Sequence, residues 1–109
     1  MEKVVISSLK ARGAPRYDHT NELFVFTISD VGMIVDKKIM SVTTREPEKL
    51  TEQLRHLRVT TLICGGMRED WKEQFRNNNI ALIDNVIGYV DDVLDHYMDR
   101  RISSGDVIS

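Results

Sequence analysis

The stretch Val59–Gly66, VTTLICGG, decides the fold of this chain. Its first part, Val59–Cys64, is a short apolar run rich in β-branched residues, which predicts a strand buried on both faces. Two glycines close the strand, and an apolar stripe of Met67, Trp71 and Phe75 follows at helical spacing. A strand that leads directly into a helix is typical of a parallel sheet with crossover helices. We therefore expect an α/β protein.

The alternation continues towards the carboxyl terminus. Asn77, Asn78 and Asn79 end the helix, because asparagine tolerates the left-handed backbone better than most residues. Ile80–Ile83 is a further short strand, and a last helix follows Gly88. The spacing of its apolar residues predicts which of them face inward: Val90, Val93, Leu94, Tyr97 and Met98.

Three strands and one helix precede the opening stretch. Lys3–Ser8 is a second apolar run and reads as a central strand. Glu22–Ser29 and Met33–Val42 are separated by so short a connection that they predict an antiparallel hairpin. In its second strand, Lys37 and Lys38 suit an exposed edge that is guarded against pairing with other chains. The following helix begins at Pro47 and places three leucines on one face: Leu50, Leu54 and Leu57.

The element order is thus β-β-β-α-β-α-β-α. Right-handed crossovers favour a five-stranded mixed sheet in which the first strand lies beside the fourth, with helices on both faces. At 109 residues the chain has room for one domain, which we place at 1–102. Residues 103–109 form a polar tail that we expect to be frayed.

The composition and charge of the chain exclude several classes of function. A net charge of −2 argues against a nucleic-acid binder held by bulk electrostatics. No stretch approaches the length that spans a membrane, and no signal peptide is expected. The single cysteine, Cys64, rules out an intrachain disulfide framework and a multi-cysteine metal site. These features favour the reducing cytoplasm.

The carboxyl ends of the first and fourth strands are the expected place for a ligand, because the chain leaves them in opposite directions. They deliver Ser7-Ser8 and Cys64-Gly65-Gly66, with Asp84-Asn85 close by. Glycines at a helix start let the backbone approach a ligand, and the free N–H groups there favour an anion. Two plainer interpretations stay open: a tight turn for Gly65 and Gly66, and a core side chain for Cys64.

A basic loop, Leu9–Asn21, faces this turn. Its cationic side chains Lys10, Arg12, Arg16 and His19 could hold a polyanion. His19 and Cys64 are the candidate metal ligands. The alternative is a solvated loop with nothing bound. Other titratable groups are expected on solvent-exposed helix faces: His56, His96, Asp91, Asp92, Asp95 and Asp99.

Several segments, in this order and spacing, resemble the dinitrogenase iron–molybdenum cofactor biosynthesis family, the NifX-like group that also supplies the carboxyl-terminal domain of NifB-type proteins. The resemblance covers about residues 3–100 and rests on the first strand and four later segments: APRYDHTNELFVFTISD, LICGG, NNNIALI and NVIGYVDDVLDHYM. It implies a ribonuclease-H-like three-layer fold. It also implies a nitrogen-fixation-related protein that holds an iron–sulfur or iron–molybdenum cofactor precursor.

Residue by residue, the resemblance is uneven. Arg16-Tyr17 falls where the family has a basic residue or histidine followed by an aromatic, and Gly88 matches its glycine before the last helix. Cys64-Gly65-Gly66 falls on its small-residue turn. This chain has Asp18 where the family usually has glycine, and Arg68-Glu69 where it often has a Gly-Pro-like helix start. Such bulkier charged side chains would make the pocket narrower or change its charge.

Two functions follow. The first is a non-catalytic carrier that holds an anionic cluster precursor through Arg12, Arg16, His19 and Cys64-Gly65-Gly66. Its expected partners are metal-cluster assembly or nitrogenase-type proteins, with a homo-oligomer as an open alternative. The second is an interaction or regulatory module that kept the fold and lost the cluster. An enzyme is not expected, since no base stands beside a nucleophile in the pattern.

Overall fold

The computed structural model describes residues 1–9, 12–13, 22–41, 47–65, 69–86, 88–99 and 104–105. Its elements alternate in the second half of the chain, as the pattern predicts. The strands are β1 (Glu2–Leu9), β2 (Arg12–Gly13), β3 (Glu22–Ile28), β4 (Ile34–Ser41), β5 (Thr61–Ile63) and β6 (Ala81–Ile83). The helices are α1 (Pro47–His56), α2 (Glu69–Asn77) and α3 (Val90–Met98).

The main sheet has the order β4-β3-β1-β5-β6. β1 is its central strand, antiparallel to β3 and parallel to β5. Val4, Val5 and Ile6 of β1 have no exposed surface, because both faces of this strand are covered. The mixed five-stranded sheet is confirmed, and so is the position of β1 beside the fourth of the expected strands.

The interpretation of Leu9–Asn21 as an unbroken loop is wrong at its start. β1 extends through Leu9, and β2 pairs with its end in the register Ser8↔Gly13 and Leu9↔Arg12. So short a polar strand shows no alternation of apolar residues, so the sequence pattern could not reveal it. The other predicted boundaries differ from the observed ones by one or two residues.

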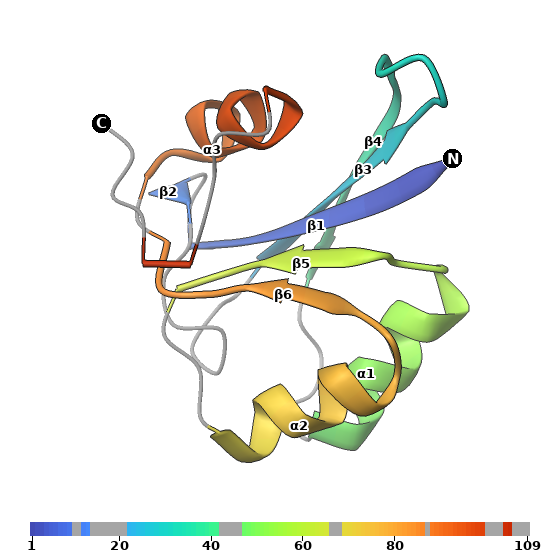
Figure 1. Cartoon of the computed structure of the whole chain (residues 1–109), viewed down its shortest axis with the longest axis vertical. Helices are drawn as coiled ribbons and strands as arrows, with labels where there is room; N and C mark the ends of the chain where they lie inside the picture. Colours follow the sequence, from blue (N-terminus) through green and yellow to red (C-terminus); the bar gives the residue numbers. More distant parts are fainter. Residues whose placement is uncertain are drawn as a thin grey trace.

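Two apolar layers enclose the sheet, with α1 and α2 on one face and α3 on the other (Figure 1). The first layer includes Val5, Leu54, Leu62 and Phe75, and the second includes Ile6 and five further buried residues: Phe24, Phe26, Ile63, Val93 and Leu94. Each such side chain contributes about 1.5–3 kcal/mol when it leaves water. The prediction of helices on both faces is confirmed. None of the described helices is long and apolar enough to cross a membrane.

Helices α1 and α2 end in the same backbone motif. Val59 N–H donates to Leu54 O at 3.0 Å, and Ile80 N–H donates to Phe75 O at 3.1 Å. The residue before each donor has left-handed backbone, with φ of 60° at both Arg58 and Asn79. The prediction that the asparagine run ends α2 is confirmed at Asn79.

Candidate functional site

Ser7 and Cys64 lie side by side at the carboxyl ends of β1 and β5. The parallel register pairs Val5 with Leu62 and Ile6 with Ile63, so the next step along both strands brings Ser7 beside Cys64. Val5, Leu62 and Cys64 belong to the layer beneath α1 and α2, and strand alternation directs Ser7 to the same face. Both residues are completely buried.

The hydroxyl of Ser7 is the unusual group here. Its Oγ is buried and has no hydrogen-bond partner in the part of the chain that the structure describes. A buried hydroxyl without a partner costs about 1–3 kcal/mol. Native structures contain few such groups, and each calls for an explanation. An unsatisfied polar atom at the strand ends, where ligands bind in sheets of this kind, is suited to meet a polar ligand.

Backbone hydrogen bonds tie the end of β5 to the segment after β6. Cys64 N–H donates to Ile83 O at 3.0 Å, and Asn85 N–H donates to Gly65 O at 3.0 Å. Val86 N–H donates to Cys64 O at 3.0 Å. Gly65 is buried, and Asn85 takes the left-handed backbone with φ of 56°. The prediction that Asp84-Asn85 lies close to the Cys-Gly turn is confirmed.

Asp84 forms a half-buried ion pair at this end of the sheet. Lys72 Nζ of α2 lies 2.8 Å from Asp84 Oδ2, and the two side chains are 15% and 13% exposed. The same ammonium group lies 3.1 Å from Glu69 Oε1. Ser104 also reaches Asp84: its Oγ accepts the Asp84 N–H at 3.0 Å. Two carboxylates therefore neutralise Lys72, which leaves little charge there for an anion.

The pKa values follow from these contacts. Burial alone would raise the pKa of Asp84, but the hydrogen bonds from Lys72 and Ser104 and the charge of Lys72 outweigh it. The pKa of Asp84 accordingly lies below its ordinary value. The hydrogen bond to Asp84, and then that to Glu69, raise the pKa of Lys72. Both groups are thus charged at neutral pH.

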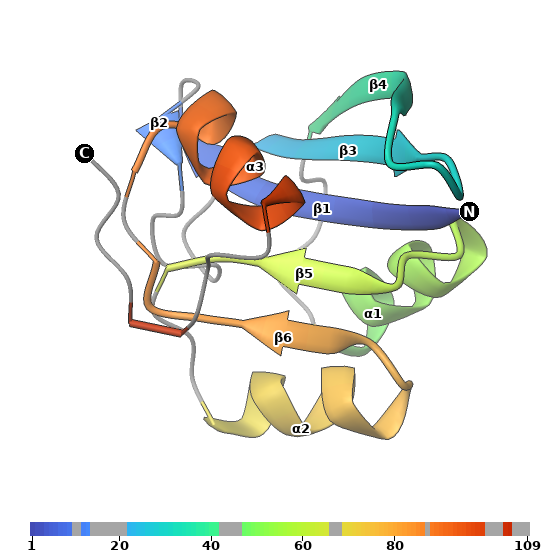
Figure 2. The same cartoon turned by 45° about the horizontal axis from the view of Figure 1, so that its top comes forward.

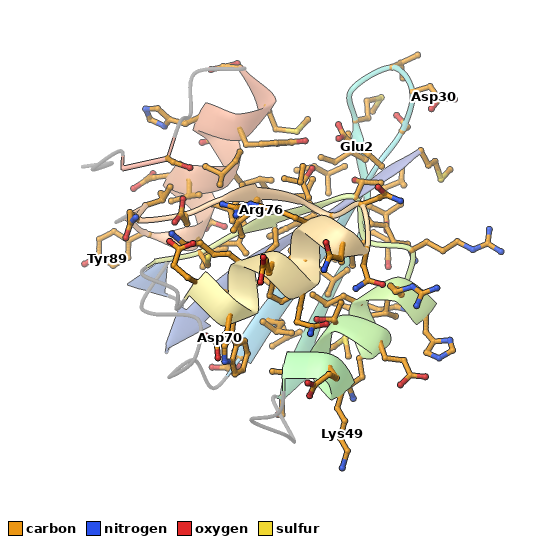
Figure 3. The ribbon with its side chains drawn as sticks, turned by 60° about the horizontal axis from the view of Figure 1, so that its bottom comes forward. Glu2, Asp30, Lys49, Asp70, Arg76 and Tyr89 are labelled. Carbon is orange, nitrogen blue, oxygen red and sulfur yellow. The ribbon has the colours of Figure 1, made fainter. Side chains whose placement is uncertain are left out.

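Two hollows lie among the described residues. One, of about 490 Å³, runs along the outer edge of β6 and is lined by Arg76, Asn79, Ile80, Ala81, Leu82, Asp84 and Ser104. The other, of about 390 Å³, lies at the amino end of β1 and includes Glu2, Asp30 and Tyr97, whose hydroxyl donates to Glu2 Oε2 at 2.8 Å. Figure 3 shows Glu2 and Asp30 on the opposite side of the molecule from Tyr89, which precedes α3. The second hollow thus lies at the amino end of β1, whereas Ser7 and Cys64 lie towards the carboxyl ends of β1 and β5.

The predicted site residues are only partly placed. Cys64 and Gly65 are buried beside Ser7, in the position expected from the strand order. Arg12 lies in β2, next to the end of β1, and its side chain is outside the described set. Arg16, His19 and Gly66 lie outside the described residues, as do Lys10, Asp18 and Arg68.

The remaining candidates behave as surface groups. His56 is exposed, and His96 is half-buried with Nδ1 2.9 Å from Asp92 O. The acidic residues of α3 and its end are exposed, as predicted: Asp91, Asp92, Asp95 and Asp99. Within the described ranges no group of three or more histidine, cysteine or acidic residues could hold a metal ion. Sequence reasoning missed Lys72, because a lysine beside Trp71 on a polar helix face gives no sign that it reaches β6.

Comparisons with known proteins give the fold context. No protein-family model matches the chain, and no curated protein matches it. Among solved structures it is similar to PH0822, at 14% identity and a TM-score of 0.84 over 94% of this chain and 95% of that one. It is also similar to a "putative dinitrogenase" from Methanocaldococcus jannaschii, at 17% identity and a TM-score of 0.75 over 93% and 91% of the two chains.

A third similar structure is a "putative NifB protein" from Thermotoga, at 15% identity and a TM-score of 0.75 over 95% and 93% of the two chains. These three likenesses extend over nearly the whole of each chain and establish a shared α/β fold. Two of the three proteins carry nitrogenase-related names, in agreement with that part of the sequence resemblance.

Proposed function

We propose that this chain is a small accessory protein that holds an anionic metal-cluster precursor, of the iron–sulfur or iron–molybdenum kind, without catalysing a reaction. The ligand would bind at the carboxyl ends of β1 and β5. The observation that carries the proposal is the buried, unpartnered hydroxyl of Ser7 beside Cys64. A polar ligand at this strand end would supply the hydrogen bond that Ser7 lacks.

The remaining parts of the site have separate roles in this proposal. Arg12, Arg16 and His19 would supply positive charge, and the Gly65-Gly66 backbone would let a bulky ligand come close. Cys64 or His19 would coordinate metal. One thiol and one imidazole cannot complete a tetrahedral set, so the precursor would keep ligands of its own.

The wider setting belongs to the same proposal. The layered arrangement would then be of the ribonuclease-H-like kind, as the sequence resemblance implies. The nitrogenase-related names of two similar structures favour an accessory role. The partners would then be cluster-assembly or nitrogenase-type proteins in the cytoplasm. The half-buried Lys72–Asp84 pair would act as a structural clamp behind the site, since its charges are already compensated.

Anaerobic expression with iron, sulfide and molybdate tests this function directly. The purified protein is expected to be coloured and to contain metal, as measured by visible absorption and metal analysis. Ser7→Ala, Cys64→Ala and His19→Ala are expected to lower the metal content, whereas the exposed control His56→Ala should leave it unchanged. A colourless, metal-free protein, or metal content equal in all four variants, would overturn the proposal.

A second candidate function is supported by a different observation. The β3–β4 hairpin exposes several large apolar side chains, which is typical of an interaction surface. In that case the chain is an interaction or regulatory module of the same fold without a cluster. Unchanged melting temperature with every metal and anion tried, together with stable partner binding, would favour this candidate over the carrier.

A further inference from the structure

The exposed apolar side chains of this protein are concentrated on one hairpin. Those of the β3–β4 turn and of β4 are 46–81% exposed: Val31, Met33, Ile34, Val35 and Ile39. Scattered apolar residues are normal on a surface, but a contiguous set marks an interaction site. Here the set follows a single strand.

β4 is also the outermost strand of the described sheet. It pairs with β3 on one side, and no described strand pairs with its other side. Figure 2 shows β4 at the margin of the sheet, with the drawn helices lying over other strands. An edge of this length presents unpaired backbone N–H and C=O groups to any strand that can add to it. The surface therefore offers backbone pairing as well as apolar contact.

We propose that the outer edge of β4 pairs with β4 of a second copy of this chain, antiparallel and about a two-fold axis through Lys37. In this register Asp36 lies opposite Lys38 of the second copy, and Lys38 lies opposite its Asp36. Ile39 of the second copy lies beside Val35, which is the extra residue of a β-bulge, since Thr27 pairs with Asp36 and Ile28 with Ile34. One strand thus supplies two ion pairs and further apolar contacts with itself, which is what an isologous interface requires.

The charges on β4 are available for this pairing. Asp36 and Lys38 are opposite Thr27 and Val25 of β3, so both project from the same face of the sheet. Both are exposed, and neither forms an ion pair within the part of the chain that the structure describes. The sequence pattern assigns Lys38 to guarding this edge against other chains, but a second copy of β4 can still pair here, because it gives Asp36 and Lys38 an oppositely charged partner each.

Lys37 is the residue that this register would place against itself. Its ammonium group lies over two rings of its own protomer, 5.7 Å from the centroid of Phe24 and 5.9 Å from that of Phe26. This position draws the charge inward along β3 by a cation–π attraction. Lys37 is therefore held away from the axis, and the like charges of two copies do not meet head on.

Neighbouring registers are poorer. An axis through Lys38 would put Asp36 opposite Met40 and Lys37 opposite Ile39, so charges would face apolar side chains. An axis through Asp36 would put this residue against its own copy and Lys38 opposite Ile34, while an axis between two residues is impossible because facing residues of antiparallel strands project from the same face of the sheet. Only the axis through Lys37 matches charge with charge on this edge.

Sedimentation velocity over a wide concentration range, at low ionic strength, tests the interface. The natural chain is expected to form a dimer in a concentration-dependent manner. Asp36→Lys and Lys38→Asp each turn two attractions per dimer into two repulsions, so each should weaken dimerisation about tenfold or more. The control Asp95→Lys makes the same charge change on an exposed position of α3 and should leave the dimer intact.

Two further samples test whether the two strands pair in the proposed register. The double variant Asp36→Lys/Lys38→Asp restores opposite charges across the axis and should dimerise as the natural chain does. An equal mixture of the two single variants should form a heterodimer, because both cross-strand pairs are then opposite in charge. Three results would each overturn the proposal. They are a natural chain that is monomeric at every concentration, a dimer that neither single substitution weakens, and a double variant that stays monomeric.

Discussion

The half-buried pair Lys72–Asp84 gives the sharpest test of how this end of the molecule is held. Lys72→Met keeps most of the apolar stem and removes the charge, so Asp84 loses its closest cation. Breaking a fully buried pair costs about 3–5 kcal/mol, and an exposed pair is worth about 0–1 kcal/mol. With side chains 15% and 13% exposed, the loss should be about 1–3 kcal/mol.

Urea unfolding of four proteins measures this value: the natural chain, Lys72→Met, Asp84→Asn and the double variant. The double-mutant cycle should return a coupling energy of about 1 kcal/mol or more. Glu69→Gln is the matched control. Its side chain is 81% exposed, and its loss should change the free energy of unfolding by no more than about 0.5 kcal/mol. A coupling energy below about 0.5 kcal/mol between Lys72 and Asp84 would refute the view that this pair clamps α2 to β6.

The pair also predicts how stability depends on pH. Asp84 has a lowered pKa, so its contribution is present above the ordinary value of 3.8 and is lost as the pH falls through the lower folded value. Lys72 has a raised pKa, so its contribution is present below 10.5 and is lost as the pH rises through the higher folded value. The stability difference between the natural chain and Lys72→Met should therefore be flat from about pH 5 to 9 and shrink beyond both ends.

Four further substitutions have definite expected outcomes. Arg58→Gly relieves a left-handed backbone at the end of α1 and should raise the free energy of unfolding by about 0.5–1 kcal/mol in urea, with a smaller gain for Asn79→Gly. Phe75→Ala empties a completely buried site and should cost about 3–5 kcal/mol, seen as a lower midpoint of urea unfolding. Ser7→Ala removes a buried hydroxyl without a partner, so thermal unfolding followed by circular dichroism should show an equal or higher melting temperature. A clear fall in melting temperature would mean that the hydroxyl has a hydrogen-bond partner.

The fold was predictable wherever apolar spacing carries the information. Val4, Val5 and Ile6 are buried on both faces of β1, and Trp71 and Phe75 form the inner side of α2. These positions are set by burial, which the order of apolar residues records directly. β2 was missed because a polar strand of two residues shows no alternation of apolar residues. The end of α1 at Arg58 was not foreseen either, since arginine gives no signal for the left-handed conformation that it adopts.

In the candidate site, only those neighbours that follow from the strand order could be predicted from the sequence. Strand order brings Ser7 and Cys64 together and places Asp84-Asn85 next to Gly65, and all of this follows from parallel pairing. The contact between Lys72 and Asp84 depends on how α2 lies against β6, which no local pattern encodes. The unpartnered state of the Ser7 hydroxyl is likewise a property of packing, and appears only in three dimensions.

The site and the proposed dimer edge should act independently, because the strand order separates them. Ser7 pairs with Leu23, and Leu23 pairs with Met40, so β1 lies two strands from the β4 edge. In the dimer the two β1 strands would be five spacings apart, roughly 24 Å, and their carboxyl ends would point in opposite directions. Dimerisation therefore leaves both sites open, and reciprocal coupling between ligand and dimer should be absent. Asp36→Lys should change the dimer and leave metal content alone, and Cys64→Ala should do the reverse. If either substitution altered both quantities, the two features would have to share a surface, and the register through Lys37 would be incompatible with that result.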